Sequence, residues 1–430
     1  MKHTLHRTKL KAGSEVLIID VPNSPALYFS TIVRAGLRYG DPERSELPHL
    51  LEHLAFEGNK DYPDGQDFAF EVEKLGAYTN AMTTESAIRY YFESSISSLE
   101  SVIQLACSQL KEPTFAPKTI KQEKAVVTQE LLRYKEDDVE RCWLNSQRQL
   151  YANGYPTIAQ SIESLDAISR KDLFDFYHRT HTSGNTKFLL AGSFGGRVKE
   201  IISLLEQNLS DYRSGDALDW RSRELTAKPS RSRSLSTRLA SQAHFRLTFH
   251  SDQPHRSLLP ALRIMNTIYN VGSFSRWHHL ARKKGLSYHP YSGYSVSRDA
   301  TQFFIADQTE PVKALELFTL GVRELSRVVA GEFSEREFER AKGYVTGDFE
   351  SSFQKPSSFA GWYGSDFSAD LELISPEDYK AQLSAVQPSD LATISELLTS
   401  GKWVLSLVGQ GIKDDEAKYR DVVRKYLGWD

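Results

Sequence analysis

Hydrophobic and polar residues follow two different periods along this chain. Residues 28–33 (YFSTIV) and 89–94 (RYYFES) show the alternation that is typical of strands. Between residues 99 and 110, apolar side chains recur every three or four positions, which predicts a helix. Each half of the chain shows strands followed by long helices. We therefore expect an α+β fold in which helices pack on a mainly antiparallel sheet.

The pattern also repeats within the chain. Residues 115–131 align with residues 333–349 at an offset of 218, and both stretches contain Val-Thr at the same place. At the same offset, Asp172 aligns with Asp390. A repeat of this length is the signature of duplicated structural units.

Two further matches extend the repeat in the same order. The apolar runs 188–192 and 404–409 align once a gap of one residue is allowed. A weaker match at an offset of 210 sets residues 75–78 beside residues 285–288. We therefore expect two homologous domains of about 210 residues, a usual domain size.

The predicted domain boundaries follow from a change in composition. We expect an N-terminal domain at 1–212 and a C-terminal domain at 239–430, joined by a linker at 213–238. The linker is rich in Ser and Arg and poor in bulky apolar residues, as a solvated segment is. Its arginines are also compatible with a nucleic-acid patch, but Trp220 is its only aromatic residue, which favours the linker interpretation.

Composition narrows the class of protein. The chain has 430 residues, of which 40% are apolar and 25% are charged, a globular profile. Its 53 basic and 56 acidic residues nearly balance, so we expect neither nucleic acid nor a membrane as partner. No window holds 18 uncharged apolar residues. Two cysteines, Cys107 and Cys142, cannot form a disulfide framework, and we expect a cytoplasmic location.

The clearest chemical signal is the pentapeptide His49-Leu50-Leu51-Glu52-His53. On a helix, two histidines four residues apart lie one turn apart on nearly the same face, where both can reach one metal ion. Glu52 sits beside them. Ser45 is the expected N-cap of this helix, and Pro48 is tolerated in its first turn. Histidines that are merely on the surface or in the core are the alternative.

A catalytic zinc site needs a third protein ligand and an open position for water. Glu130 is the candidate, 77 residues after His53, in a stretch of helical character at 119–133. Glu123 lies seven residues earlier, nearly two turns, and so on the same helix face. Val126 and Val127 make that face apolar, and buried carboxylates need a partner such as a cation. Two solvated glutamates remain the alternative.

These residues resemble the inverzincins, the pitrilysin and mitochondrial processing peptidase family of zinc endopeptidases. The stretches 56–58 (FEG), 80–85 (NAMTTE) and 338–342 (FERAK), together with the helix that carries Glu123 and Glu130, are similar to recurrent blocks of that family. The resemblance runs through both halves. It is closest to the short-chain branch, in which one chain holds two domains. Such a chain forms half of a clam-shell, and two chains complete it.

The resemblance implies roles for individual residues. His49, His53 and Glu130 would bind zinc, and Glu52 would be the general base that takes a proton from the zinc-bound water. Glu123 would orient a ligand. Asn80 and Ala81 would lie on an edge strand whose backbone pairs with an extended peptide substrate, although Asn80 alone is equally typical of a turn.

The second half shows no such zinc set, because Asp348 aligns with Glu130 and Ala341 with Glu123. In the family, this domain commonly supplies an Arg and, seven residues later, a Tyr that hold the substrate carbonyl. Here Tyr288 matches the Tyr, but Ala281 stands at the Arg position and Arg282 is one residue late.

Two explanations of that departure remain open. Either Arg282 takes the role, or the Arg/Tyr pair comes from a related second subunit in a homo- or heterodimer. The divided site predicts that the chain alone binds zinc but cleaves peptides poorly. Alternatively, Tyr288, Tyr291 and Tyr294 are only packed aromatic residues of a strand and turn.

We therefore expect a zinc endopeptidase that acts on short or unfolded peptides. A non-catalytic or weakly catalytic subunit that binds peptide, and a maturation factor with one dedicated peptide substrate, are the alternatives. Manganese or cobalt could fit the same ligands. The remaining histidines lack a third ligand at a recognised spacing, and we expect structural or surface roles for them; they include His178, His181, His278, His279 and His289.

Overall fold

The computed structural model describes residues 2–151, 155–221, 232–235, 242–400, 402–409 and 412–428. The chain forms two compact units, and each is built from more than one stretch of sequence. Unit 1 comprises 1–132, 156–222 and 352–374, and unit 2 comprises 133–155, 223–351 and 375–430. Within the predicted linker at 213–238, residues 222–231 and 236–238 lie outside the described part of the chain.

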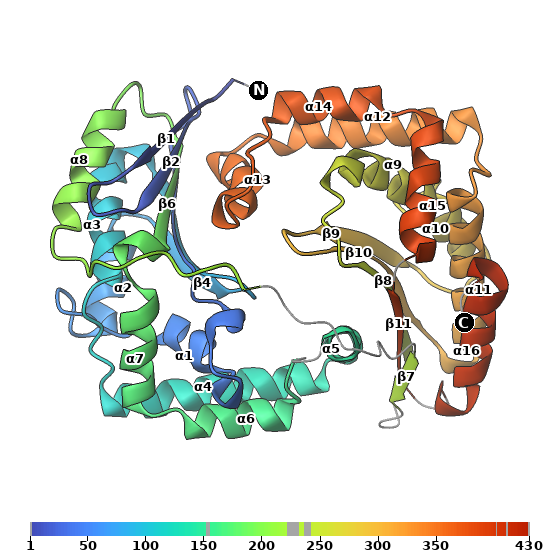
Figure 1. The fold of residues 1–430 in the computed structure, drawn as a ribbon, viewed down its shortest axis with the longest axis horizontal. Coiled ribbons are helices and arrows are strands. Elements are labelled where there is room, and N and C mark those ends of the chain that lie inside the picture. The colour runs from blue at the N-terminus through green and yellow to red at the C-terminus, as the bar shows by residue number, and fades with distance from the viewer. Residues whose placement is uncertain are drawn as a thin grey trace. The chain divides into compact units, whose positions relative to one another are not determined.

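Unit 1 contains a six-stranded sheet in the order β1-β2-β6-β3-β5-β4. Figure 1 labels β1, β2, β4 and β6 of this sheet. Its neighbouring strands are antiparallel except for the parallel pair β2 and β6. The strands are β1 (Thr4–Lys9), β2 (Glu15–Asp20), β3 (Ala26–Val33), β4 (Tyr78–Thr83), β5 (Ile88–Ser95) and β6 (Thr186–Gly192). The stretches predicted as strands, 28–33 and 89–94, lie in β3 and β5.

Helices cover both faces of this sheet. Figure 1 shows α3 and α8 on one face and α13 on the other. The helices grouped with unit 1 are α1 (Leu47–Leu54), α2 (Gly65–Lys74), α3 (Leu99–Gln109), α4 (Pro117–Glu136), α6 (Ile158–Ala167), α7 (Arg170–Thr180), α8 (Val198–Asn208) and α13 (Pro356–Ser368), with short 3-10 turns η1 (Leu37–Tyr39), η2 (Pro42–Arg44), η3 (Ile96–Ser98) and η4 (Ser183–Asn185). The predicted helices at 99–110 and 119–133 are α3 and α4.

Unit 2 contains a five-stranded sheet in the order β7-β11-β8-β10-β9. Its strands are β7 (Ser232–Leu235), β8 (Ala243–Ser251), β9 (Tyr291–Val296), β10 (Thr301–Thr309) and β11 (Lys402–Val408). Its helices are α5 (Asp138–Leu150), α9 (Leu259–Tyr269), α10 (Arg276–Lys283), α11 (Pro311–Val329), α12 (Glu335–Ser352), α14 (Pro376–Ala385), α15 (Leu391–Ser400) and α16 (Ile412–Leu427), with η5 (Arg256–Leu258) and η6 (Pro388–Asp390).

The two sheets share one topology. In both, four antiparallel strands are flanked by one strand that pairs in parallel, β2 with β6 and β7 with β11. The predicted α+β fold with two homologous halves is therefore confirmed. Corresponding hydrogen bonds repeat as well: Thr128 Oγ1 donates to the Lys124 carbonyl at 2.7 Å, and Thr346 Oγ1 donates to the Lys342 carbonyl at 2.9 Å.

One predicted match is out of register by a residue. Gly76 and Gly285 each follow a helix and have positive φ angles of 60° and 64°, which glycine adopts without strain. The amide after each glycine donates to a carbonyl five residues earlier, Ala77 to Val72 and Leu286 to Ala281. The glycines therefore correspond at an offset of 209, whereas the sequence match used 210.

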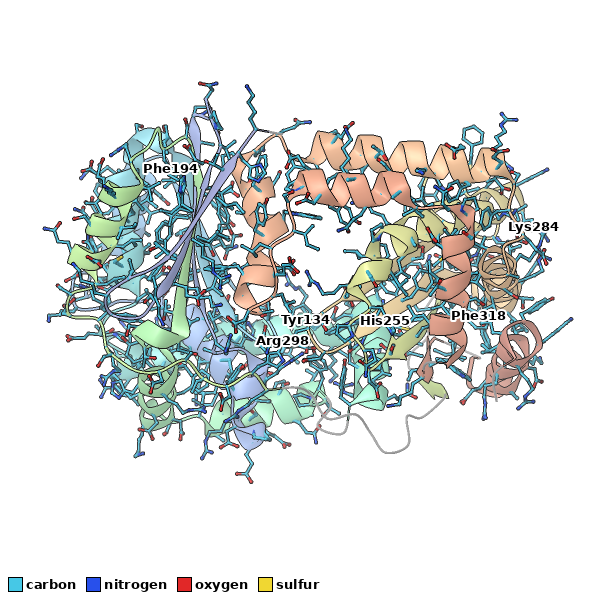
Figure 2. All side chains as sticks on the ribbon, turned by 45° about the horizontal axis from the view of Figure 1, so that its top comes forward. Tyr134, Phe194, His255, Lys284, Arg298 and Phe318 are labelled. Carbon is cyan, nitrogen blue, oxygen red and sulfur yellow. The ribbon has the colours of Figure 1, made fainter. Side chains whose placement is uncertain are left out.

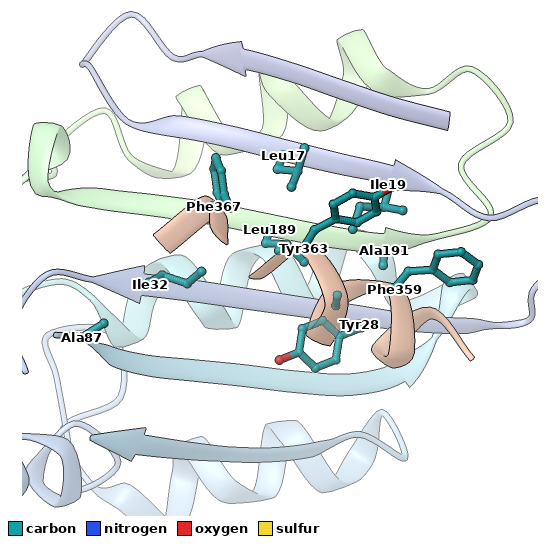
Figure 3. Close-up of a cluster of buried hydrophobic side chains, with 11 residues drawn as sticks. Leu17, Ile19, Tyr28, Ile32, Ala87, Leu189, Ala191, Phe359, Tyr363 and Phe367 are labelled. Carbon is teal, nitrogen blue, oxygen red and sulfur yellow. The ribbon is translucent and has the colours of Figure 1, made fainter. Parts of the chain in front are cut away.

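Each sheet receives one helix from the other half of the sequence. In unit 1, α13 packs on β2, β3 and β6 and places Phe359, Tyr363 and Phe367 among buried side chains of the sheet (Figure 3). After α13, Asp370 forms ion pairs with Arg34 and Lys187. The sheet side of this cluster comprises Leu17, Ile19, Tyr28, Ile32, Ala87, Leu189 and Ala191.

In unit 2, α5 and α11 pack on opposite faces of β8. Phe245 of β8 contacts Phe318 of α11, with ring centroids 5.2 Å apart. Phe318 is labelled in Figure 2. The neighbouring His244 points the other way, and its Nε2 lies 3.9 Å from Asp138 of α5. The helices α5 and α13 come from opposite halves of the sequence, so neither unit is one continuous stretch of chain. The domain borders at residues 212 and 239 stay predictions.

Two expectations from composition can be compared with the fold. Cys107 and Cys142 are both free and buried, and burial raises the pKa of their thiols to about 12 and about 11. Among the described residues, no helix combines the length and the apolar character that crossing a membrane requires.

Candidate active site

The helix α1 presents the histidine pair. It begins at Leu47 with Pro48 in its first turn, and its N-cap is Glu46 rather than the predicted Ser45, which belongs to the preceding turn. One face of α1 is buried and apolar, formed by Leu47, Leu50, Leu51 and Leu54. That packing leaves His49, Glu52 and His53 on the partly exposed face.

Three predicted ligands lie together. The rings of His49 and His53 have centroids 5.0 Å apart, and the Nε2 atom of each lies 3.7 Å from Oε2 of Glu130. One ligand atom from each residue lies within 4.8 Å of the others. No other group of three or more potential metal-binding side chains is found in the described part of the chain.

The helix α4 supplies both predicted acids. Glu123 and Glu130 point to the same side, and their side chains are 15% and 26% exposed. Between them Val127 is fully buried, but Val126 is 50% exposed. The prediction of an apolar stripe is therefore right for Val127 and wrong for Val126, because α4 packs through one face only.

Each histidine has a carboxylate on its other nitrogen. His53 Nδ1 lies 3.1 Å from Glu123 Oε2, and His49 Nδ1 lies 3.1 Å from Glu46 Oε2. Such partners fix the ring orientation and the tautomer of a metal-binding histidine. Glu46 was not among the residues predicted from the sequence; its signal was an acid three residues before the first histidine, one helical turn away.

Glu52 is held by a residue on the sheet. Thr83 Oγ1, at the end of β4, donates a 2.6 Å hydrogen bond to Glu52 Oε2. Among the described residues, no hydrogen bond reaches the other oxygen of Glu52. Thr83 lies in the stretch 80–85 that resembles the family, but its contact with Glu52 depends on how α1 packs on β4, which the sequence pattern does not reveal.

The strand β4 is the edge of the first sheet, as the resemblance implied for Asn80 and Ala81. Asn80 lies within the strand and not in a turn, and its side chain is exposed. Its Oδ1 accepts a 2.8 Å hydrogen bond from the Ala81 amide, and its Nδ2 donates to the Tyr78 hydroxyl at 2.8 Å. The Asn80 side chain therefore occupies a backbone donor of the edge strand.

Several carboxylates surround the histidines and affect their charge. Burial lowers the pKa of His49, but the hydrogen bond and charge of Glu46 and the charges of Glu52 and Glu130 outweigh it, so the net pKa is raised. Burial, together with the charge of Glu123, raises the pKa of Glu57. This concentration of negative charge favours a bound cation.

The donor set fits zinc. Zinc bonds to imidazole nitrogen and carboxylate oxygen are about 2.0–2.2 Å long, so the ligand atoms of a tetrahedral ion lie about 3.3–3.6 Å apart. The two Nε2–Oε2 distances of 3.7 Å are close to that spacing. Three protein ligands also leave one position for water, as in catalytic zinc sites.

Unit 2 holds the second group of predicted residues. Arg282 lies on α10, with its guanidinium 5.0 Å from the centre of the Tyr288 ring, and Tyr288 is 78% exposed. Ala281 is fully buried. Tyr291 and Tyr294 belong to β9, and burial raises the pKa of Tyr291 to about 12. The alternative of packed aromatic residues therefore fits Tyr291 and Tyr294, but it does not fit the exposed Tyr288.

The position that corresponds to Glu130 in unit 2 has an ordinary partner. Asp348, on α12, pairs with Arg263 of α9 at 3.0 Å.

Two of the remaining histidines have structural contacts. His181 lies 3.1 Å from the Tyr90 hydroxyl, and burial lowers its pKa to about 3. His278 lies between the backbone carbonyls of Gly272 and Tyr288.

Comparison with known proteins agrees with the two halves of the chain. The family model described as Insulinase (Peptidase family M16) matches residues 15–161, and the model described as Peptidase M16 inactive domain matches residues 167–344. An uncharacterized zinc protease of Rickettsia felis is 23% identical over 415 residues, covering 95% of this chain and 98% of the relative. Mitochondrial-processing peptidase subunit beta of Homo sapiens is 28% identical over 203 residues, covering 46% of this chain and 39% of the relative.

Solved structures share the fold. A protease from Helicobacter pylori has a TM-score of 0.83 at 17% identity and covers 95% of this chain and 100% of its own. A structure from Pseudomonas fluorescens, described as a peptidase M16 inactive domain, has a TM-score of 0.82 at 20% identity, covering 94% and 98%. The family resemblance drawn from the motifs is confirmed: the chain belongs to the insulinase family, peptidase family M16.

Proposed function

We propose that this protein is a zinc-dependent endopeptidase of the inverzincin type. His49, His53 and Glu130 are its zinc ligands, and Glu52 is its general base. The observation that carries the proposal is the convergence of the three ligand atoms within 4.8 Å, on the face of α1 that also presents Glu52. Relatives along nearly the whole chain are named zinc proteases, which supports the same chemistry.

Different residues of unit 1 bind the peptide and transfer the proton during hydrolysis. An extended peptide pairs with the open edge of β4 at Asn80 and Ala81, through backbone bonds that are largely independent of sequence. When bound, zinc would polarise the scissile carbonyl and lower the pKa of water at the site. Glu52 takes the proton of the attacking water on the oxygen that Thr83 does not hold, and later returns it to the leaving amine.

We further propose that a related second subunit completes the site. Ala281 is buried at the position where an Arg is expected, so this chain holds no side chain there that could reach a peptide. Arg282 and Tyr288 lie together on an exposed part of unit 2 and are the substitute pair if no partner supplies one. One relative is named as a subunit, which supports an assembly of more than one chain. A cytoplasmic location also stays a prediction.

The missing Arg also favours a second candidate function, a weakly catalytic subunit that binds peptide. One experiment separates the two. Bound metal is measured in the purified chain, and cleavage of an unfolded peptide is followed with and without chelator. A catalytic chain contains zinc, loses activity with chelator, and loses about 10²–10⁴-fold in rate in Glu52→Gln, as expected for a missing general base.

Three outcomes are informative. If the chain binds one equivalent of zinc but does not cleave peptide, and a related subunit restores cleavage, the result supports a divided site. Robust turnover by the lone chain, abolished in Glu52→Gln, supports the endopeptidase and excludes the divided site. A chain that binds no zinc under conditions where it is folded contradicts the proposal.

A further inference from the structure

Glu46 is a buried carboxylate that the family motif does not include. It is the N-cap of α1, one turn before His49, and only 8% of its surface is exposed. Its Oε2 lies 3.1 Å from His49 Nδ1. A buried carboxylate requires a hydrogen-bonded or charged partner, and His49 is the partner that the structure provides.

The carboxylate of Glu46 does not cap its own helix through a hydrogen bond. An N-cap side chain usually accepts a hydrogen bond from a backbone amide of the first turn, but the Glu46 side chain makes no such bond in α1. The side chain reaches His49 instead. The Glu46 carboxylate therefore contacts an imidazole and not a backbone amide of its own helix.

The backbone of Glu46 is fixed independently of its side chain. Its amide donates to Ser164 Oγ at 3.2 Å, and Ser45 Oγ donates to the same oxygen at 3.2 Å. Ser164 lies on α6 and is buried. The start of α1 is thus held by α6, so the Glu46 carboxylate has a defined position from which to orient the ring of His49.

The arrangement around the two histidines is symmetric. Each ring turns Nε2 toward Glu130 and Nδ1 toward a second carboxylate, Glu123 for His53 and Glu46 for His49. The carboxylates differ in origin, since Glu123 comes from α4 and Glu46 from α1 itself. A histidine whose Nδ1–H donates to a carboxylate keeps the Nε2 lone pair available for a metal.

We propose that Glu46 is a positioning residue for zinc. By accepting the Nδ1 proton of His49, it fixes the ring and its tautomer so that Nε2 faces the site. The inference rests on the proposed zinc site, and it adds a requirement that the ligand set alone does not contain: binding of the ion depends on an acid outside the three ligands.

The test compares Zn²⁺ binding to the full chain and to its variants, measured by competition with a chelator of known affinity. Glu46→Ala should weaken zinc binding about 10–100-fold, the usual effect of removing such a partner. Glu46→Gln keeps an acceptor but loses the charge, so its affinity should lie between those of Glu46→Ala and the unchanged chain. Glu43→Ala, an exposed acid three residues earlier, is the matched control and should bind zinc normally.

Two readouts distinguish positioning from mere stabilisation of α1. In chelator, the thermal midpoint of Glu46→Gln should match that of the unchanged chain, whereas the rise in midpoint on adding zinc should be smaller. In chelator, ¹⁵N spectra of histidine-labelled protein should show that Glu46→Gln and Glu46→Ala weaken the preference of His49 for the Nδ1-protonated tautomer.

The outcomes separate this inference from the proposed function. If the unchanged chain binds no zinc, the proposed function fails. If the unchanged chain binds zinc and Glu46→Gln and Glu46→Ala bind it equally well, Glu46 has no positioning role. Should Glu46→Ala not fold, Glu46→Gln decides by the same comparison.

Discussion

At the scale of single residues, the hydrogen bond from Thr83 to Glu52 links the proposed general base to the sheet. A hydrogen bond to a charged group contributes about 1.5–3 kcal/mol. In the proposed mechanism, the other carboxylate oxygen of Glu52 takes the proton from water. The orientation of the base therefore depends on a hydroxyl that belongs to the strand proposed to bind the peptide.

Replacing Thr83 by Val should lower kcat about 10–100-fold, because Glu52 loses the bond that orients it. Zinc affinity should not change, since Thr83 touches none of the three proposed ligands. Thr79→Val is the matched control, because Thr79 lies on the same strand and its hydroxyl donates to the Tyr91 carbonyl. Equal kcat values for the two variants would argue against this role of Thr83.

A buried aspartate in unit 2 should make stability depend on pH. Burial raises the pKa of Asp307 to about 6, and hydrogen bonds from Ser287 and the Gln308 amide offset part of that effect. The folded chain then binds the proton more tightly than the unfolded chain. The resulting stabilisation is full below about pH 4 and is lost as the pH rises through 6.

Asp307→Asn should therefore become more stable relative to the unchanged chain as the pH rises from 4 to 7.5, by about 2 kcal/mol. Urea unfolding at the two pH values measures the difference. The exposed Asp216 gives a control variant, Asp216→Asn. A gain for Asp307→Asn that is the same at both pH values would contradict the assignment.

Residues of the site were predictable where spacing alone brings them together. His49, Glu52 and His53 share a helix face by periodicity, and Glu123 and Glu130 do so on a second helix. Thr83 and Glu46 were not predictable in the same way. Their contacts depend on how α1 packs on β4, and on a carboxylate turning to an imidazole in place of capping its helix.

At the scale of elements, β4, the strand proposed to bind the peptide, lies at the edge of its sheet. The Ala81 amide of this edge strand donates a 2.8 Å hydrogen bond to Asn80 Oδ1. A peptide that pairs with β4 must displace that side chain and take over the donor. Proline lacks the donor, and it is tolerated on edge strands whose N–H faces outward.

Ala81→Pro should therefore raise KM for peptide cleavage with little change in zinc affinity. Ala81→Gly retains the N–H and is the matched control, with a KM near that of the unchanged chain. Steady-state kinetics on one unfolded peptide measures both. If Ala81→Pro leaves KM unchanged, the peptide does not use this donor.

The helix α13 covers a large part of one face of the first sheet. Phe359 is 3% exposed and packs within the cluster that includes Ile19 and Tyr28. Truncating a buried Phe to Ala typically costs about 3–5 kcal/mol. Gly361, on the same helix, has open space where a Cβ would lie.

Phe359→Ala should lower the free energy of unfolding by about 3–5 kcal/mol, because it leaves a cavity under α13. Gly361→Ala should raise it by about 0.5–1 kcal/mol, since alanine is the better helix former. Chemical denaturation of both variants gives the comparison. Similar destabilisation by both changes would mean that α13 is not packed as described.

Periodicity predicted the elements better than their ends. The strands at 28–33 and 89–94 and the helices α3 and α4 follow from alternation and three-to-four spacing. The start of α1 did not follow, because Ser45 is an intrinsically good cap but a short 3-10 turn already uses it. The exposure of Val126 did not follow either, since helix packing covers only part of the face that its position suggested.

At the scale of the whole molecule, the duplication was visible in the sequence but the exchange of helices was not. Matching motifs reveal that two halves have a common origin, and the order of five strands, β2-β6-β3-β5-β4, is repeated in the second sheet. Which sheet a helix packs on depends on apolar faces that look alike in sequence. The helices α5 and α13 therefore fall into the unit opposite to their half of the chain.

The predicted N-terminal domain, residues 1–212, should not be stable by itself. Without α13 it exposes an apolar face that includes Leu17, Ile19 and Leu189. Such a face binds hydrophobic dyes and promotes aggregation. We expect residues 1–212 alone to bind dye and unfold without a sharp transition, whereas a version that also carries residues 352–374 through a flexible linker unfolds cooperatively.

The exchanged helix has a consequence for how the protein is made. Unit 1 needs a segment that ends at residue 374, although its other parts are complete by residue 222. At roughly 5–20 residues per second, a ribosome takes about 8–30 s to add those about 150 residues. During that interval the nascent first sheet lacks its cover, so a chaperone that recognises exposed apolar strands should bind at this stage of translation.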